Sequence, residues 1–174
     1  MIEYEGKDIR NVVLLGHAGS GKSTFIESAL LLTNEIDRMG NSSDGSLAMD
    51  YDPEEAKRGL SVYSSIAPIQ WKGRKINFID TPGYLDYEGD MVSGASVADL
   101  ALIFVSGKEG QQSGTEKAAN LAIKLGIPIC FLINNADEGI KFEEIAKSLT
   151  DVYGRGAVPF LIPEMDGNKM IGVR

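Results

Sequence analysis

A glycine-rich run that ends in lysine and serine constrains this chain more than any other feature. Residues 16–23 read Gly-His-Ala-Gly-Ser-Gly-Lys-Ser and fit the pattern G-x-x-x-x-G-K-[ST]. The run follows the apolar stretch Val12–Leu15, which predicts a buried strand, and precedes apolar residues at helical spacing from Phe25 to Leu32. Glycines let consecutive backbone N–H groups turn inward around an anion, and the following helix adds its positive end. The pattern predicts a phosphate-binding loop. The alternative is a glycine-rich turn with an incidental lysine.

Apolar runs alternate with helical patterns along the rest of the chain. Leu100–Val105 and Ile129–Ile133 are continuous apolar runs typical of buried strands. Between them, Ser113 and Glu116 fit a capping box at the start of a helix that Gly126 and Pro128 end. Further patterns predict a strand pair, Ser61–Trp71 with Lys75–Asp80, and a helix over Ile140–Tyr153. The alternation predicts an α/β fold, a mostly parallel sheet with helices on both faces.

Two segments leave alternatives open. Residues 34–60 show no periodicity and collect Asn, Ser, Gly and Asp, which indicates either a surface insertion or a functional loop. The last apolar run, Val158–Ile162, precedes a polar tail. It either adds an edge strand to the sheet or leaves the sheet short.

The charge balance excludes some classes of partner. Against 17 Lys and Arg stand 25 Asp and Glu, a net charge of −8, so bulk electrostatics predict no membrane binding and no sequence-specific DNA binding. The sequence holds no stretch of about 18 apolar residues, and Met1–Glu5 is not a signal peptide, which predicts a cytoplasmic protein. The single cysteine, Cys130, excludes an intramolecular disulfide and a cysteine-cluster metal site.

Two short motifs follow predicted strands. In Asp80-Thr81-Pro82-Gly83, Asp80 can hold Mg²⁺ through water, and the Gly83 N–H can bond a γ-phosphate only when one is present. In Asn134-Asn135-Ala136-Asp137, the carboxylate of Asp137 could accept hydrogen bonds from the N1–H and amine of guanine. Each motif by itself is also consistent with an ordinary polar turn after a strand.

Taken together, these residues resemble the GTP-binding domain of translational GTPases, with elongation factor G and its elongation factor G-like paralogs nearest. Arg58–Val62 resembles the family's R-G-I-T-I segment, and the three motifs occur in the family's order over essentially the whole chain. The resemblance implies a phosphate-loop NTPase fold in one domain, 1–174, which ends within or at the start of the family's inserted subdomain and could lack the last core strand. Residues 34–62 would then be switch I and 82–93 switch II.

The resemblance also implies an activity. The chain would bind GTP and GDP with Mg²⁺, hydrolyse GTP to GDP, and meet the ribosome through the full-length protein. Ser23 and Ser61 would ligate Mg²⁺, the latter when switch I closes over GTP, and Lys22 would contact the β- and γ-phosphates. The implied nucleotide-binding residues are Gly16, His17, Ala18, Gly19, Ser20, Gly21, Lys22, Ser23, Thr24, Asp80, Gly83, Asn134 and Asp137.

The sequence departs from the family pattern at three positions. Tyr84 replaces the histidine that orients the attacking water, and a hydroxyl with a pKa near 10 is a poor base, which predicts slower hydrolysis. Tyr84 is either a catalytic residue or a switch residue that packs against apolar neighbours. Asn135 replaces a lysine whose stem packs against the nucleotide, and Gly19 replaces an aspartate found in many relatives. Two further functions are kept as alternatives. One is a guanine-nucleotide switch with negligible hydrolysis, and the other is an adenine-specific ATPase or kinase, which Asp137 disfavours.

Overall fold

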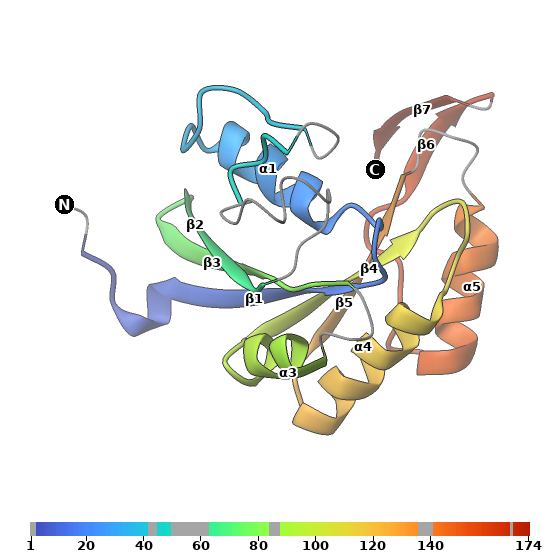
Figure 1. Cartoon of the computed structure of the whole chain (residues 1–174). Helices are drawn as coiled ribbons and strands as arrows, with labels where there is room; N and C mark the ends of the chain where they lie inside the picture. Colours follow the sequence, from blue (N-terminus) through green and yellow to red (C-terminus); the bar gives the residue numbers. More distant parts are fainter. Residues whose placement is uncertain (1–2, 42–44, 50–62, 84–87, 136–140, 168) are drawn as a thin grey trace.

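The computed structural model describes residues 3–41, 45–49, 63–83, 88–135, 141–167 and 169–174. Figure 1 labels its α-helices and β-strands along the chain. In order, they are η1 (Gly6–Asp8), β1 (Ile9–Gly16), α1 (Lys22–Leu32), β2 (Ser65–Trp71), β3 (Arg74–Asp80), α3 (Glu88–Ser96), β4 (Leu100–Ser106), α4 (Ser113–Leu125), β5 (Ile129–Asn134), α5 (Phe142–Tyr153), β6 (Pro163–Asp166) and β7 (Lys169–Val173).

The main sheet has five strands in the order β2-β3-β1-β4-β5. Strand β1 pairs in parallel with β3 and with β4, and β4 pairs in parallel with β5. Strand β2 runs antiparallel to β3, to which it is joined through a turn at Lys72 and Gly73. The carboxyl ends of β1, β3, β4 and β5 therefore lie along one edge of the sheet, where ligands of open α/β sheets bind.

Helices cover both faces of this sheet, as the sequence predicted (Figure 1). Because side chains alternate along a strand, Val12 and Leu14 of β1 pack on one face with Ile26 and Leu30 of α1. Val13 packs on the other face, among the alanines of α4 and Ala95 of α3. A smaller cluster joins α5 to the end of β4 on that second face. The α/β architecture is confirmed.

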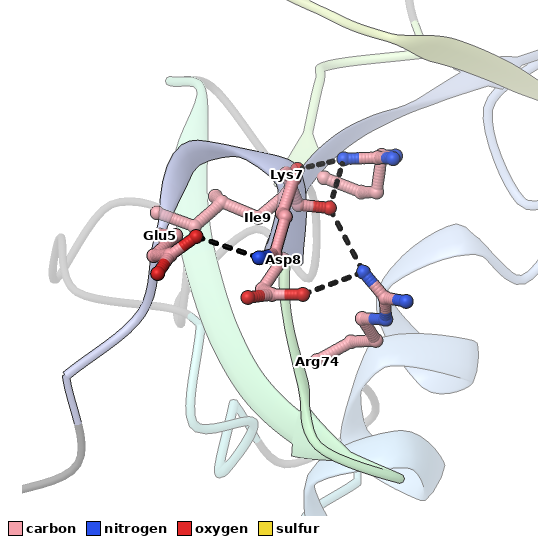
Figure 2. Close-up of polar contacts among 6 residues, drawn as sticks. Glu5, Lys7, Asp8, Ile9 and Arg74 are labelled. Carbon is pink, nitrogen blue, oxygen red and sulfur yellow. Dashed lines mark hydrogen bonds and ion pairs between the residues drawn. The ribbon is translucent and has the colours of Figure 1, made fainter.

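The start of the chain is tied to the start of β3. Figure 2 shows the Arg74 guanidinium donating to the Lys7 carbonyl oxygen at 2.9 Å and to the Asp8 carboxylate at 2.6 Å. Asp8 in turn donates its N–H to the Glu5 carbonyl at 2.8 Å, which closes the η1 turn. The Arg74 side chain is about half exposed, so this ion pair contributes only about 0–1 kcal/mol, and its main effect is on local geometry.

Three details differ from the sequence predictions. Helix α4 begins at Ser113 with Gln112 as its cap, because the Gln112 N–H donates to Thr115 Oγ1 at 3.4 Å, so the capping box of Ser113 with Glu116 was wrong. Helix α3 was not predicted, since two glycines and two serines leave it without an apolar stripe. The polar tail after Ile162, for which no element was predicted, forms the β6–β7 hairpin with a turn at Gly167.

The run Val158–Ile162 does not join the main sheet. It contains no strand residues, and Ile162 instead exchanges two backbone hydrogen bonds of 2.9 Å with Arg174 at the base of the hairpin. Within the described residues the sheet therefore ends at β5, the shorter of the two outcomes that the sequence left open. Separately, none of the helices in the described ranges has the length and apolar character needed to cross a membrane.

Candidate nucleotide site

The three predicted motifs meet at the carboxyl edge of the sheet. The glycine-rich loop follows β1, Asp80–Gly83 follows β3, and Asn134 ends β5. The strand order places β1 between β3 and β4, so the loop lies at the centre of the edge with the other two motifs on either side. Sequence positions up to 118 residues apart, from Gly16 to Asn134, are thus brought into one site.

The glycine-rich loop curls around the ammonium group of Lys22. Lys22 Nζ donates to the carbonyl oxygens of Gly16 at 3.2 Å and His17 at 3.1 Å, and the Ser20 N–H bonds the His17 carbonyl at 3.3 Å. Helix α1 begins at Lys22, with Gly21 as its cap. Because the first N–H groups of a helix lack partners within the helix, they and the lysine together form an anion-binding arrangement.

Two of the loop's glycines are required by close approaches. Gly16 has a φ of +135°, and a Cβ there would lie 2.7 Å from the carbonyl oxygen of Phe104 on the neighbouring β4. Gly21 has a φ of +91°, and its Cβ would lie 2.2 Å from the side-chain nitrogen of Asn134. Both positions combine a backbone conformation that side chains disfavour with a lack of space, so the sequence pattern has a steric cause here.

Burial lowers the pKa of Lys22 below its usual value, because the folded chain removes the ammonium from water. The nearby carboxylate of Asp80 acts in the opposite direction and favours the charged form. Only 6% of Lys22 is exposed. A buried cation of this kind is stabilised by an anion, which matches the phosphate-binding role predicted for it.

Ser23 and Asp80 lie in direct contact. The Ser23 hydroxyl donates to Asp80 Oδ2 at 2.6 Å, and Asp80 is 1% exposed. Hydroxyl and carboxylate oxygens are the hard donors that Mg²⁺ prefers, and Mg²⁺ retains several waters in such sites. The donor set present therefore fits a Mg²⁺ ion held by Ser23 and, directly or through water, by Asp80.

The segment after β3 lies against the glycine-rich loop. A Cβ on Gly83 would lie 2.7 Å from the backbone of Ala18 and from Lys22 Nζ. Thr81 fixes the start of this segment, because its hydroxyl donates to the Leu14 carbonyl at 2.8 Å. The Gly83 backbone is thus adjacent to the lysine predicted to contact the terminal phosphates.

Asn134 ties β5 to the glycine-rich loop. Its side-chain amide donates to the Ser20 carbonyl oxygen at 2.9 Å, and Asn135 follows with a φ of +57°. The sequence predicted that Asn134 belongs to the nucleotide site, and in the folded chain its side chain contacts the loop. Thr24 is exposed on the first turn of α1. The predicted residues Ser61, Tyr84 and Asp137 lie outside the described residues.

A cavity of about 420 Å³ adjoins the loop. That volume is within the usual range of small-molecule sites. The Ser20 hydroxyl is buried there and makes no hydrogen bond within the described part of the chain. The lining residues are Ala18, Gly19, Ser20, Ser106, Lys108, Glu109, Gln112 and Asn135.

Four of these lining residues, from Ser106 to Gln112, were not predicted from the sequence. Ser106 ends β4 and the other three follow it, and the position of β4 next to β1 in the sheet is the signal that could have found them. Gly19 and Asn135, two of the three positions that depart from the family pattern, also line the cavity. An aspartate and a lysine at these positions would place side chains along its wall.

The lowered pKa of Lys22 predicts that nucleotide affinity depends on pH. Bound phosphate raises the lysine pKa again, so the complex holds the proton more tightly than the free chain. Affinity for GDP should therefore fall as the pH rises through the lowered pKa of free Lys22. Titration of a fluorescent GDP from about pH 7 to about pH 10 measures this. The Lys22→Arg variant, whose guanidinium stays charged, should lose less affinity over that range. Equal losses would contradict the assignment.

The α/β fold, with the glycine-rich loop at the carboxyl edge of its sheet, defines a phosphate-loop nucleotide-binding domain. A family profile described as "Elongation factor Tu GTP binding domain" matches residues 7–162. The chain belongs to this family of GTP-binding domains, those of the translational GTPases.

Similar proteins agree with this family. The chain is 32% identical over 160 residues to "Elongation factor G-like protein" of Mycobacterium tuberculosis (strain CDC 1551 / Oshkosh). It is also 32% identical over 158 residues to "Elongation factor G-like protein" of Thermotoga maritima. These matches cover 91% and 90% of this chain and 22% of each relative.

A solved structure is similar in both sequence and fold. It is the crystal structure of ttk003000868 from Thermus thermophilus, with a TM-score of 0.91 and 34% identity. The match covers 97% of this chain and 25% of that one. The chain thus spans about a quarter of the length of its relatives.

Proposed function

We propose that this chain binds GTP and GDP together with Mg²⁺ and hydrolyses GTP, as the GTP-binding domain of an elongation factor G-like protein. The supporting observation is the group formed by Lys22, Ser23 and Asp80. In it, a buried ammonium lies near a hydroxyl and a carboxylate, both able to ligate a metal ion, beside the phosphate loop. The family supports guanine as the base. Action on the ribosome through the full-length protein, and a cytoplasmic location, are parts of the same proposal.

The residues divide the chemistry between them. The loop amides and Lys22 hold the phosphates and offset the charge that develops during phosphoryl transfer. Ser23 and Asp80 would hold the Mg²⁺, together with Ser61, and the ion would neutralise negative charge on the β- and γ-phosphates. Gly83 would donate its N–H to the γ-phosphate. Because its hydroxyl is a weak base at neutral pH, Tyr84 would orient the attacking water by a hydrogen bond and would not take a proton from it.

Competition with a fluorescent guanine nucleotide tests the binding step. GTP and GDP should displace the probe, and ATP should not, with and without Mg²⁺. If GTP and GDP both fail at millimolar concentration, the proposal is wrong, and tighter binding of ATP would favour the adenine-specific alternative. Measuring phosphate release from GTP then distinguishes a GTPase from the alternative function, a guanine-nucleotide switch with negligible hydrolysis.

The Asp137→Asn substitution should change the base that the chain selects. Aspartate accepts hydrogen bonds from the guanine N1–H and amine, whereas asparagine can donate to the 2-oxygen of xanthine. We expect GDP affinity to fall about 100-fold and xanthosine diphosphate to bind better than GDP, because an unpaired polar group in a base pocket is strongly unfavourable. Competition titrations measure both affinities. Unchanged selectivity would mean that Asp137 does not contact the base.

A further inference from the structure

The cavity beside the glycine-rich loop is bounded by the ends of three neighbouring strands. Residues 18–20 of the loop follow β1, four residues between 106 and 112 end or follow β4, and Asn135 follows β5. Lys22 and Ser23, which the proposed function assigns to the phosphates and Mg²⁺, are not among the lining residues. The cavity is therefore a space next to the phosphate site to which the proposed function gives no role.

The topology of the sheet explains why a space opens here. Strand β4 lies next to β1, although β2 and β3 come between them in the sequence. The loop after β1 leads to α1, which packs on one face of the sheet, and the turn after β4 leads to α4, which packs on the other. Loops that leave adjacent strands for opposite faces separate at the carboxyl edge, and ligands of open α/β sheets bind in the crevice between them. The position of the cavity in the fold thus favours a bound ligand.

A second observation, on the loop side of the cavity, indicates that this ligand is polar. Ser20 is 2% exposed, and its hydroxyl makes no hydrogen bond within the described part of the chain. The backbone of Ser20 is already in use, because its N–H bonds the His17 carbonyl at 3.3 Å and its carbonyl accepts from Asn134 at 2.9 Å. A buried hydroxyl without a partner is unfavourable. A polar group bound in the cavity would supply the missing hydrogen bond.

The wall opposite the loop is a tight turn that carries Lys108. The Gly110 N–H donates to the Ser106 carbonyl at 2.8 Å, and the Glu109 N–H donates to Ser106 Oγ at 3.1 Å. These two hydrogen bonds close the turn after β4, and Lys108 lies within it. Because the backbone is already held, fixing the Lys108 side chain on a ligand costs side-chain entropy but little backbone entropy.

The charges around the cavity favour an anion near Lys108. Its neighbour Glu109 is held away by Gln112, whose side-chain amide donates to Glu109 Oε2 at 2.6 Å at the start of α4, where a helix favours negative charge. At the loop itself, the nearby buried carboxylate of Asp80 partly offsets the positive charge of Lys22. A nucleoside diphosphate or triphosphate brings several negative charges to this loop. A second cation on the cavity side would therefore be favourable.

We propose that Lys108 is a nucleotide-binding residue. Its ammonium attracts the phosphate chain of GDP and GTP from the cavity, whereas Lys22 acts from within the loop. The turn after β4 thereby becomes a third part of the nucleotide site, beside the glycine-rich loop and the segment after β3. This inference rests on the proposed function and adds a contact to it.

The test compares Lys108→Met with Lys108→Arg, which keeps the charge, and with Lys147→Met. Lys147 is exposed on α5, so this control removes the same charge away from the cavity. In about 0.1 M salt, calorimetric titration should show GDP affinity about 5-fold lower in Lys108→Met, since contacts between exposed charges contribute up to about 1 kcal/mol. Affinity should stay within about 2-fold in Lys108→Arg and in Lys147→Met.

Salt dependence separates an electrostatic contact from a structural role. Raising the salt from about 0.1 M to about 1 M shortens the Debye length from about 10 Å to about 3 Å, so the loss in Lys108→Met should shrink below about 2-fold. The melting temperature of the free variant should not change, because the side chain is exposed. A loss that is equal at both salt concentrations, or no loss at about 0.1 M, overturns the assignment of Lys108.

The unaltered chain distinguishes this inference from the proposed function. If it binds neither GDP nor GTP, the proposed function fails and the role of Lys108 with it. If it binds GDP and Lys108→Met binds GDP equally well, only the role of Lys108 fails.

Discussion

Replacing Lys22 with methionine should lower the affinity for GDP and GTP at least about 100-fold while leaving the free chain folded. Hydrogen bonds from a charged donor contribute about 1.5–3 kcal/mol each, and two such bonds to phosphate correspond to about 100-fold or more in affinity. In the free chain, the substitution removes a buried ammonium group, whose charged form burial disfavours, as its lowered pKa shows. The stability gained by removing this buried charge offsets the loss of the hydrogen bonds to the Gly16 and His17 carbonyls.

The melting temperature of the free Lys22→Met variant should therefore stay within about 4 °C of the unaltered chain, which corresponds to about 1 kcal/mol for a domain of this size. Lys117→Met is the matched control, because Lys117 is exposed on α4 and distant in sequence from the loop. Lys117→Met should change neither the nucleotide affinity nor the melting temperature. Nucleotide binding that survives in Lys22→Met would mean that the lysine is structural only.

The Gly21→Ala substitution is expected to reduce both stability and nucleotide affinity. Its Cβ would lie 2.2 Å from the Asn134 side-chain nitrogen, which must move and give up its 2.9 Å hydrogen bond to the Ser20 carbonyl. The left-handed backbone adds about 1–2 kcal/mol of strain. Together we expect about 3 kcal/mol of destabilisation and at least about a 10-fold loss of GDP affinity, measured by denaturant unfolding and by titration.

Gly19→Ala separates backbone strain from the clash. Gly19 also has a positive φ, of +75°, but nothing lies within 4 Å of the position where its Cβ would be. This variant should show only the strain, about 1–2 kcal/mol. In a double-mutant cycle, Asn134→Ala should remove much of the extra destabilisation of Gly21→Ala, since it removes the atom that the new methyl group meets. Additive effects would contradict the proposed contact.

The sequence predicted the parts of the fold that local chemistry determines. Positions 16 and 21 of the loop have no room for a side chain, because they lie against β4 and β5. The glycine pattern therefore identified both the loop and its position between strand and helix. The runs at β4 and β5 are apolar because both faces of those strands are covered. The end of α4 was also predicted, since Gly126 adopts the left-handed conformation that ends a helix.

Other parts were missed because their signals are weak or non-local. Helix α3 has Gly89 and Gly94 within nine residues, and a Cβ at Gly94 would lie 3.1 Å from both Ile79 and Thr81, a close packing that a sequence alone does not reveal. The β6–β7 hairpin carries one local signal, the Asp-Gly pair at Asp166, but the apolar residues on either side of it do not alternate as those of a hairpin usually do.

Within the site, sequence patterns identified residues but not their partners. The contact of Ser23 with Asp80 joins positions 57 residues apart, and that of Asn134 with Ser20 joins positions 114 apart. Glu27 shows no motif at all. The two N–H groups that its buried carboxylate accepts, those of Gly40 and Ala48, are brought to it only by the folded chain.

The central position of β1 has a practical consequence for measuring these affinities. Because β1 is hydrogen-bonded to a strand on each side, we expect it to open only when the whole domain unfolds, and the glycine-rich loop is attached directly to it. A ligand bound to the loop stabilises the folded domain against global unfolding. At a given ligand concentration, a ligand with a lower dissociation constant should therefore raise the melting temperature more. Simple thermal-shift assays can therefore rank nucleotides and variants of this chain.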